Sequence, residues 1–109
     1  MRLQYKATNA LVVARARALP DAAWDALPVV RIPRGTVLHS NIEKLVQRHI
    51  DKVVSGVEAY RDDYPALLYR TDAGDLHIVD GHHRAAICAA LELDLPARVA
   101  DSGTGGRFA

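Results

Sequence analysis

The chain has 109 residues and a mass of 11.9 kDa, which is enough for one hydrophobic core but not for two domains of ordinary size. Half of the residues are hydrophobic and a quarter are charged, which excludes the disordered and collagen-like classes. A single cysteine, Cys88, excludes an internal disulfide and is typical of a cytoplasmic protein. No apolar run approaches the roughly 20 residues of a membrane helix, and no signal-peptide pattern follows Met1. The sequence therefore predicts a small soluble cytoplasmic domain without a membrane partner.

Charge is distributed unevenly along the chain. The net charge is +1, from 14 basic and 13 acidic residues, and by itself this balance predicts no polyanionic partner. Residues 1–37, however, carry six basic and two acidic residues, whereas residues 71–109 carry three basic and six acidic ones. The basic third could contact DNA or an acidic partner protein, and the alternative is an ordinary solvated surface. Its six basic residues are Arg2, Lys6, Arg15, Arg17, Arg31 and Arg34.

The first third of the chain is rich in alanine. Residues 9–19 favour a helix, although the apolar residues 11–13 would also suit a strand. Pro20 and Asp21 predict a break and the capped start of a short helix, in which Trp24 is a packing residue. Residues 28–33 then read as a strand that ends at a proline, followed by a turn at Arg34 and Gly35.

A capping box gives the clearest helix start in the sequence. Ser40 and Glu43 have the spacing at which each side chain can bond the other's backbone amide. Apolar residues then recur three and four positions apart, which predicts a helix with one face against the core. These residues are Ile42, Leu45, Val46, Ile50, Val53, Val54 and Val57.

The second half of the chain alternates strand and helix signals. Residues 66–70 and 76–79 predict two strands of a hairpin around a turn at residues 72–75, a helix follows Gly81, and residues 95–99 predict a last strand. The fold class is therefore α+β, with a small mixed sheet covered by helices. We expect an amino-terminal extension packed on the domain (residues 1–27), the domain itself (residues 28–101) and a flexible tail (residues 102–109).

The segment Asp80-Gly81-His82-His83-Arg84 places three donor side chains where a strand runs through a glycine into a helix. The first amides of a helix lack internal partners, and its amino end carries about half a positive charge. Such a terminus is a ready phosphate site. Gly81 would let an anion approach, Arg84 offers a planar fork of donors, and the histidines can hydrogen-bond and titrate near neutral pH. The segment predicts phosphate binding by Gly81, His82, His83 and Arg84; the alternative is that Arg84 pairs inside the protein, with Asp80 or another carboxylate.

The stretch from Leu76 to Val99, LHIVDGHHRAAICAALELDLPARV, resembles the signature of the ParB-like, sulfiredoxin-like superfamily. That signature is a strand, a glycine, two variable residues, an arginine, a helix of small residues and a proline-containing strand. Residues 29–33 are similar to the family's opening strand and residues 42–54 to its next helix. The resemblance covers residues 28–100 and implies a ParB-like nuclease domain, of the kind found singly in phages and mobile elements.

The resemblance implies a nucleotide at this corner. In the superfamily, ParB proteins bind CTP there, sulfiredoxins bind ATP, and a free-serine kinase uses ADP, so CTP or ATP with Mg²⁺ is the expected ligand here. Asp80, His83 and Glu43 are the candidate catalytic residues, Asp80 to orient a histidine or Mg²⁺, and Glu43 by similarity to a glutamate of the serine kinase. Sulfiredoxin chemistry is not expected, because His82 stands where sulfiredoxins have their catalytic cysteine. The helix-turn-helix and dimerisation domains of ParB proteins have no counterpart in the chain.

Three functions remain open from the sequence. The first is nucleotide or phosphate binding, with or without nuclease, NTPase or phosphotransfer activity. The second is a non-catalytic module that binds a host protein, and the third is a non-specific nucleic-acid binder. No dedicated metal site is predicted, because adjacent helix positions diverge by about 100° and His82 and His83 do not easily share an ion. Of the other polar candidates, His77 is expected to be exposed, His39 and His49 to lack partners, and Cys88 to be a small core residue.

Overall fold

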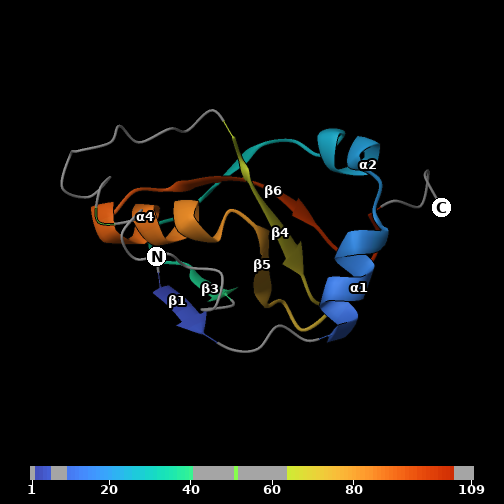
Figure 1. Cartoon of the computed structure of the whole chain (residues 1–109), viewed down its shortest axis with the longest axis horizontal. Helices are drawn as coiled ribbons and strands as arrows, with labels where there is room; N and C mark the ends of the chain where they lie inside the picture. Colours follow the sequence, from blue (N-terminus) through green and yellow to red (C-terminus); the bar gives the residue numbers. More distant parts are fainter. Residues whose placement is uncertain (1, 6–9, 41–50, 52–63, 105–109) are drawn as a thin grey trace.

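A computed structural model describes residues 2–5, 10–40, 51 and 64–104. These residues form both strands and helices, as the sequence patterns predict for an α+β domain (Figure 1). The elements are β1 (Arg2–Tyr5), α1 (Ala10–Ala18), α2 (Asp21–Asp25), β2 (Val30–Ile32), β3 (Val37–Ser40), β4 (Ala66–Arg70), β5 (Leu76–Asp80), α4 (His82–Leu91) and β6 (Leu95–Ala100).

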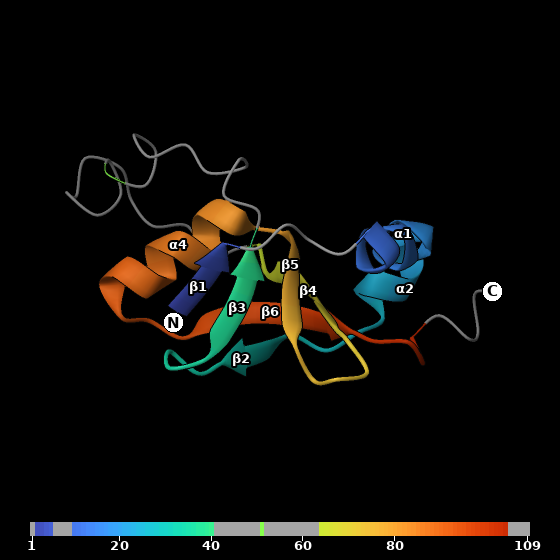
Figure 2. The same cartoon turned by 90° about the horizontal axis from the view of Figure 1, so that it is seen from below.

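The strands form one mixed sheet in the order β1-β3-β5-β4-β6-β2. Strands β1, β3 and β5 are parallel neighbours, while β4 pairs antiparallel with β5 and β2 antiparallel with β6. The carboxyl ends of β1, β3 and β5 therefore share one edge of the sheet, and α4 begins at that edge (Figure 2). The prediction of a small mixed sheet with helices is confirmed.

The main core lies between the sheet and α4. Helix α4 contributes small side chains, Ala85 and Cys88, both completely buried, so its backbone can lie close to the strands. Leu38, Leu68 and Leu95 are also fully buried and come from three different strands. The prediction that Cys88 is a core residue is confirmed. The other members of this cluster are Ile32, Ala66, Leu76, Ile78 and Ala97.

A second, smaller core lies on the opposite side of the β4–β5 pair, where Figure 1 shows α1 and α2. Trp24 and Tyr69 are its large members, with 6% and 2% of their surface exposed. The Arg98 side chain on β6 holds α2 in place, because its Nη1 donates hydrogen bonds to the backbone carbonyls of Asp25 and Leu27. The expected packing role of Trp24 is confirmed.

Most of the predicted elements have counterparts in the structure. The short helix after Pro20, the hairpin around residues 72–75, the helix after Gly81 and the last strand are confirmed. Helix is the correct choice for residues 9–19, since α1 spans Ala10–Ala18. The start of α2 has no side-chain cap, contrary to the cap predicted at Asp21. Residues 101–104 form a turn in which the Asp101 carboxylate accepts from the Gly103 amide.

Some predictions concern residues outside the described ranges. The capping box begins at Ser40, the last residue of β3, but Glu43 and the apolar face from Ile42 to Val57 lie outside the described residues, as does His49. Strands β1 and β3 have no counterpart in the predicted elements. Among the described residues, no helix has the length and apolar character required to cross a membrane.

The sequence interpretation of two histidines is wrong. The sequence predicts an exposed His77, but only 9% of its surface is accessible. The reason is the position of β5, which lies between β3 and β4 and has its alternate residues covered on both faces. His39 was expected to lack a partner, yet its ring stacks on that of His77, its register partner across the β3–β5 pair.

Candidate functional site at the start of helix α4

Gly81 gives the corner between β5 and α4 its shape. Its backbone has φ 95° and ψ 29°, a left-handed conformation that glycine adopts without steric cost. A Cβ at this position would lie 2.9 Å from the Cβ and 3.1 Å from the Cα of Ala66 on β4. The close approach of β4 therefore requires a glycine at this position. This reason is additional to the access for an anion that the sequence suggests.

The pairing of β5 with β4 has an irregularity near the end of β5. Leu67 pairs with Asp80, whereas the next residue, Leu68, pairs with Ile78, so Val79 is an extra residue in β5. Asp80 is exposed, and its Oδ1 accepts a hydrogen bond from the Gly81 amide at 2.9 Å. Among the described residues, the Asp80 carboxylate forms no ion pair with Arg84. Arg84 has its contacts elsewhere within the protein.

The first turn of α4 carries three basic or titratable side chains and no acidic one. His82, His83 and Arg84 are all partly buried, and each makes contacts within the protein. The Nη1 atom of Arg84 is completely enclosed. The glycine at the N-cap supplies no side-chain hydrogen bond to the first amides. The amino end of a helix is usually stabilised by acidic side chains. The first turn of α4 instead carries basic or titratable ones.

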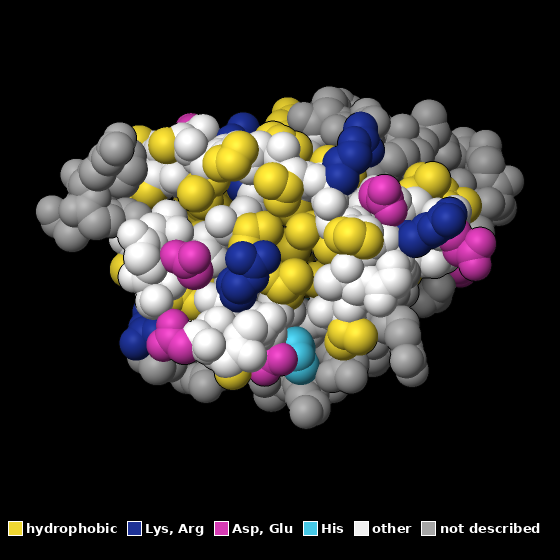
Figure 3. Space-filling view, turned by 180° about the vertical axis from the view of Figure 1, so that it is seen from behind, with side chains coloured by type: hydrophobic (Ala, Val, Ile, Leu, Met, Phe, Trp, Pro, Cys, Tyr) yellow, Lys and Arg dark blue, Asp and Glu magenta, His cyan; other side chains and the backbone are white. Residues whose placement is uncertain are grey.

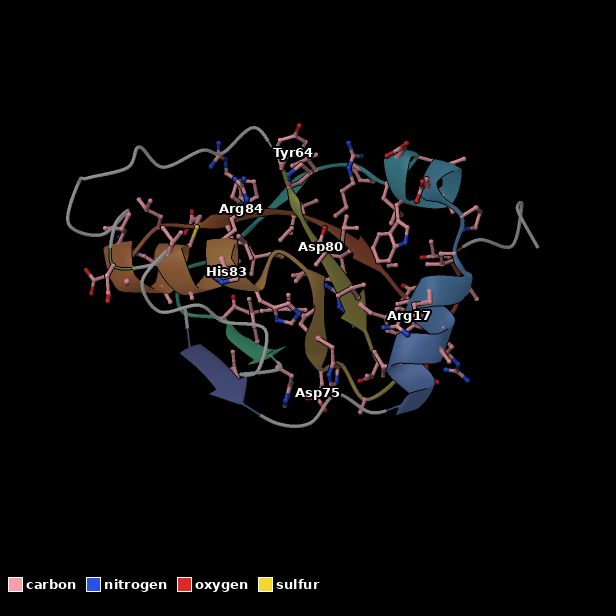
Figure 4. All side chains as sticks on the ribbon, in the orientation of Figure 1. Arg17, Tyr64, Asp75, Asp80, His83 and Arg84 are labelled. Carbon is pink, nitrogen blue, oxygen red and sulfur yellow. The ribbon has the colours of Figure 1, made fainter. Side chains whose placement is uncertain are left out.

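Further residues lie at the same edge of the sheet. Tyr64 precedes β4 by two residues and therefore lies beyond the β4 end that faces Gly81. It is an exposed large hydrophobic residue, with 67% of its surface accessible. Figure 4 shows Tyr64, Asp80, His83 and Arg84 around the start of α4, whereas Arg17 lies away from it on α1. The sequence analysis does not identify Tyr64 as a site residue. Tyr64 and Gly81 are far apart in the sequence, and only the fold places them at the same end of β4.

The candidate site residues from the sequence are brought together only in part. Asp80, Gly81, His82, His83 and Arg84 form one corner, while Glu43 lies outside the described residues. In the described ranges, no three His, Cys, Asp or Glu side chains form a group that could hold a metal ion. A Mg²⁺ ion fits this corner only as a companion of bound phosphates, with Asp80 the nearest carboxylate in the sequence able to provide an oxygen ligand.

Basic side chains of the first third are exposed, among them Arg15, Arg17, Arg31 and Arg34. On the face shown in Figure 3, the described Arg side chains are mostly separated from one another and interspersed with acidic ones. Hydrophobic side chains occupy the middle of this face. The described residues on this face therefore resemble a mixed surface more than a continuous basic patch of the kind that binds nucleic acid.

No protein-family model matches this chain, and the search of curated proteins also found no match.

Proposed function

We propose that the chain is a ParB-like domain of the sulfiredoxin-like fold, which binds a nucleotide or another phosphate group at the corner formed by Gly81, His82, His83 and Arg84. The observation that carries the proposal is the first turn of α4, with three donor side chains, no acid and no side-chain cap. An anion at this point would complement both the helix dipole and the side chains.

The position of the corner within the sheet supports the same proposal. In open sheets with parallel strands, ligands bind outside the carboxyl ends of the strands. Here β1, β3 and β5 all end at the edge where α4 begins. The Arg84 guanidinium offers bidentate hydrogen bonds to phosphate oxygens, and the His82 and His83 rings add further donors.

Tyr64 favours a nucleoside phosphate over a bare phosphate. An exposed aromatic ring at a binding edge is a platform on which a base can stack, and such stacking contributes about 1–3 kcal/mol per base. Tyr64 lies at the Gly81 end of β4, so a base on its ring and phosphates at the start of α4 would occupy one edge of the sheet.

The proposal extends to chemistry on the bound phosphate through residues of the same corner. His83 lies in the first turn of α4, and an imidazole is the side chain that most often serves as a general acid or base. Asp80 can orient a histidine or contribute an oxygen to Mg²⁺, which would arrive with CTP or ATP and neutralise phosphate charge. Glu43 completes the proposed catalytic set. A held phosphate beside a proton-transfer group is an arrangement that nuclease, NTPase and phosphotransfer reactions can use.

Thermal unfolding with added ligands tests the proposal. We expect CTP or ATP with Mg²⁺ to raise the melting temperature by about 10 °C or more at a hundred times the dissociation constant. Inorganic tripolyphosphate should give a smaller rise, because it lacks a base to stack on Tyr64. No stabilisation by any nucleotide or polyphosphate would contradict phosphate binding at this corner.

Tyr64→Ala separates the base from the phosphates in the same assay. The variant should lose most of the difference between nucleotide and tripolyphosphate, whereas Tyr64→Phe should keep it, since stacking requires only the ring. An unchanged preference for nucleotide in Tyr64→Ala would remove Tyr64 from the site without affecting the assignment of the phosphate corner.

A further inference from the structure

Two histidine rings on neighbouring strands, one buried and one largely buried, stack on each other. The ring centroids of His39 on β3 and His77 on β5 are 4.7 Å apart, and the ring planes are inclined by 20°. The Oδ1 atom of Asp75 lies 3.8 Å from the Nε2 atom of His39. Only 12% of the His39 side chain is exposed, against 59% of the Asp75 side chain. The pair is therefore enclosed, with one exposed carboxylate at its side.

Both rings carry a buried nitrogen without a hydrogen-bond partner. In the described part of the chain, the Nδ1 atoms of His39 and His77 have no such partner and no access to solvent. A neutral imidazole has one donor and one acceptor nitrogen, whereas a protonated ring has two donors. Protonation would therefore place a charge on an enclosed ring, which the largely exposed Asp75 carboxylate offsets only in part, and a second proton on the other ring would add repulsion across 4.7 Å.

The pairing of β3 with β5 joins two parts of the sheet. Strand β1 lies at the edge and pairs with β3, and β3 is held to the rest of the sheet by β5. His39 and His77 are the residues in register across this pair. A change in the charge of the two rings thus acts at the junction between β1–β3 and the other four strands.

From this placement, we propose that the His39–His77 stack is an acid-sensitive latch, which holds β1 and β3 against β5 when both rings are neutral and loosens them when the rings are protonated. The proposal is independent of phosphate binding. The titratable groups around the pair are Asp75, which directly precedes β5, and the buried Tyr69 on β4, which is in register with His77. Helix α1 packs near β5 and carries Arg15 and Arg17, both exposed to solvent.

The sign of the pH effect follows from His77. Burial lowers its pKa from the ordinary value of 6.5, the neighbouring His39 lowers it further, and Asp75 opposes both. In the unfolded chain the ring titrates near 6.5, so below that pH the unfolded state binds more protons than the folded state. Stability contributed by the neutral pair is therefore complete above about pH 6.5 and falls as the pH decreases below it.

Melting temperatures at two pH values test the latch. For the wild type we expect a melting temperature lower by about 5 °C or more at pH 5.5 than at pH 7.5, a range in which ordinary carboxylates remain ionised. His77→Phe retains a flat ring but cannot be protonated, so its melting temperature should change much less between the two pH values. His83→Gln removes a histidine from the corner and should keep the full decrease. Amide exchange, corrected for its intrinsic pH dependence, should quicken at pH 5.5 in β1 and β3 before β4 and β6.

Two results would overturn the proposal. One is a wild-type melting temperature that is equal at both pH values, and the other is a decrease in His77→Phe as large as in the wild type. Should His77→Phe fail to fold, NMR titration of the His77 ring in the wild type decides the matter. A midpoint below 6.5 supports the latch, whereas a midpoint at or above 6.5 contradicts it.

Discussion

Replacing Gly81 by alanine is expected to destabilise the domain by about 2–5 kcal/mol. Two causes combine at this position. A left-handed backbone costs a non-glycine residue about 1–2 kcal/mol, and the added Cβ would meet Ala66 at 2.9 Å, which requires one of two packed elements to shift. Gly81→Val would cost more, because the larger side chain meets the same strand. Thermal or urea unfolding of the variants measures the loss.

Two other glycines separate these causes. Gly74 has φ 91° but nothing within 4 Å of its added Cβ, so Gly74→Ala should show the backbone cost alone, about 1 kcal/mol. Gly35 has neither a positive φ nor a close neighbour, so Gly35→Ala should change stability by less than about 0.5 kcal/mol. Equal stability of the Gly81→Ala and Gly74→Ala variants would show that the contact with Ala66 costs nothing.

Arg84→Ala is expected to weaken nucleotide binding at least tenfold. The guanidinium would lose charged hydrogen bonds to phosphate, each of which contributes about 1.5–3 kcal/mol, and 1.4 kcal/mol corresponds to a factor of ten in affinity. Arg84→Lys should give an intermediate loss, because an ammonium keeps the charge but not the planar fork. Isothermal titration with CTP and ATP in the presence of Mg²⁺ measures both effects.

Arg17→Ala is the matched control for Arg84. Arg17 is exposed on α1 and lies away from the corner in Figure 4, so its loss removes the same charge without touching the site. The Nη1 atom of Arg84 is buried, so circular dichroism must first show that each variant is folded. An affinity in Arg84→Ala equal to that in Arg17→Ala would exclude Arg84 from phosphate binding. Absence of binding by the wild type, with a large loss of stability in Arg84→Ala, would instead assign Arg84 to internal packing.

Local signals in the sequence predict the elements around the corner well. The β4–β5 hairpin follows from two short apolar runs around an Asp-Ala-Gly-Asp turn, and α4 follows from Gly81 and a run of small residues. Each of these features depends on residues that are close together in the chain. The corner at residues 80–84 could therefore be located without any tertiary information.

Features that depend on distant partners could not be found in this way. Strand β1 exists through its parallel pairing with β3, more than 30 residues later. The four residues of β1 alternate between polar and apolar, but so short a run does not predict a strand, and the four residues of β3 do not alternate. His77 is buried because both faces of the central strand β5 are covered. In such a strand, the alternation of polar and apolar residues does not predict which side chains are exposed. The sequence explains Gly81 only by access for an anion. It does not indicate the close contact with Ala66, because that residue belongs to another strand.

Amide chemical shifts during a titration with CTP or ATP and Mg²⁺ test phosphate binding at the corner most directly. The largest changes are expected at the amides from Gly81 to Ala85, because the first turn of α4 would donate hydrogen bonds to the phosphates. Inorganic tripolyphosphate should shift the same amides, and the amides of α1 should change little with either ligand. Largest changes at α1, or no change at the start of α4 when the ligand saturates the protein, would contradict a phosphate site at this corner.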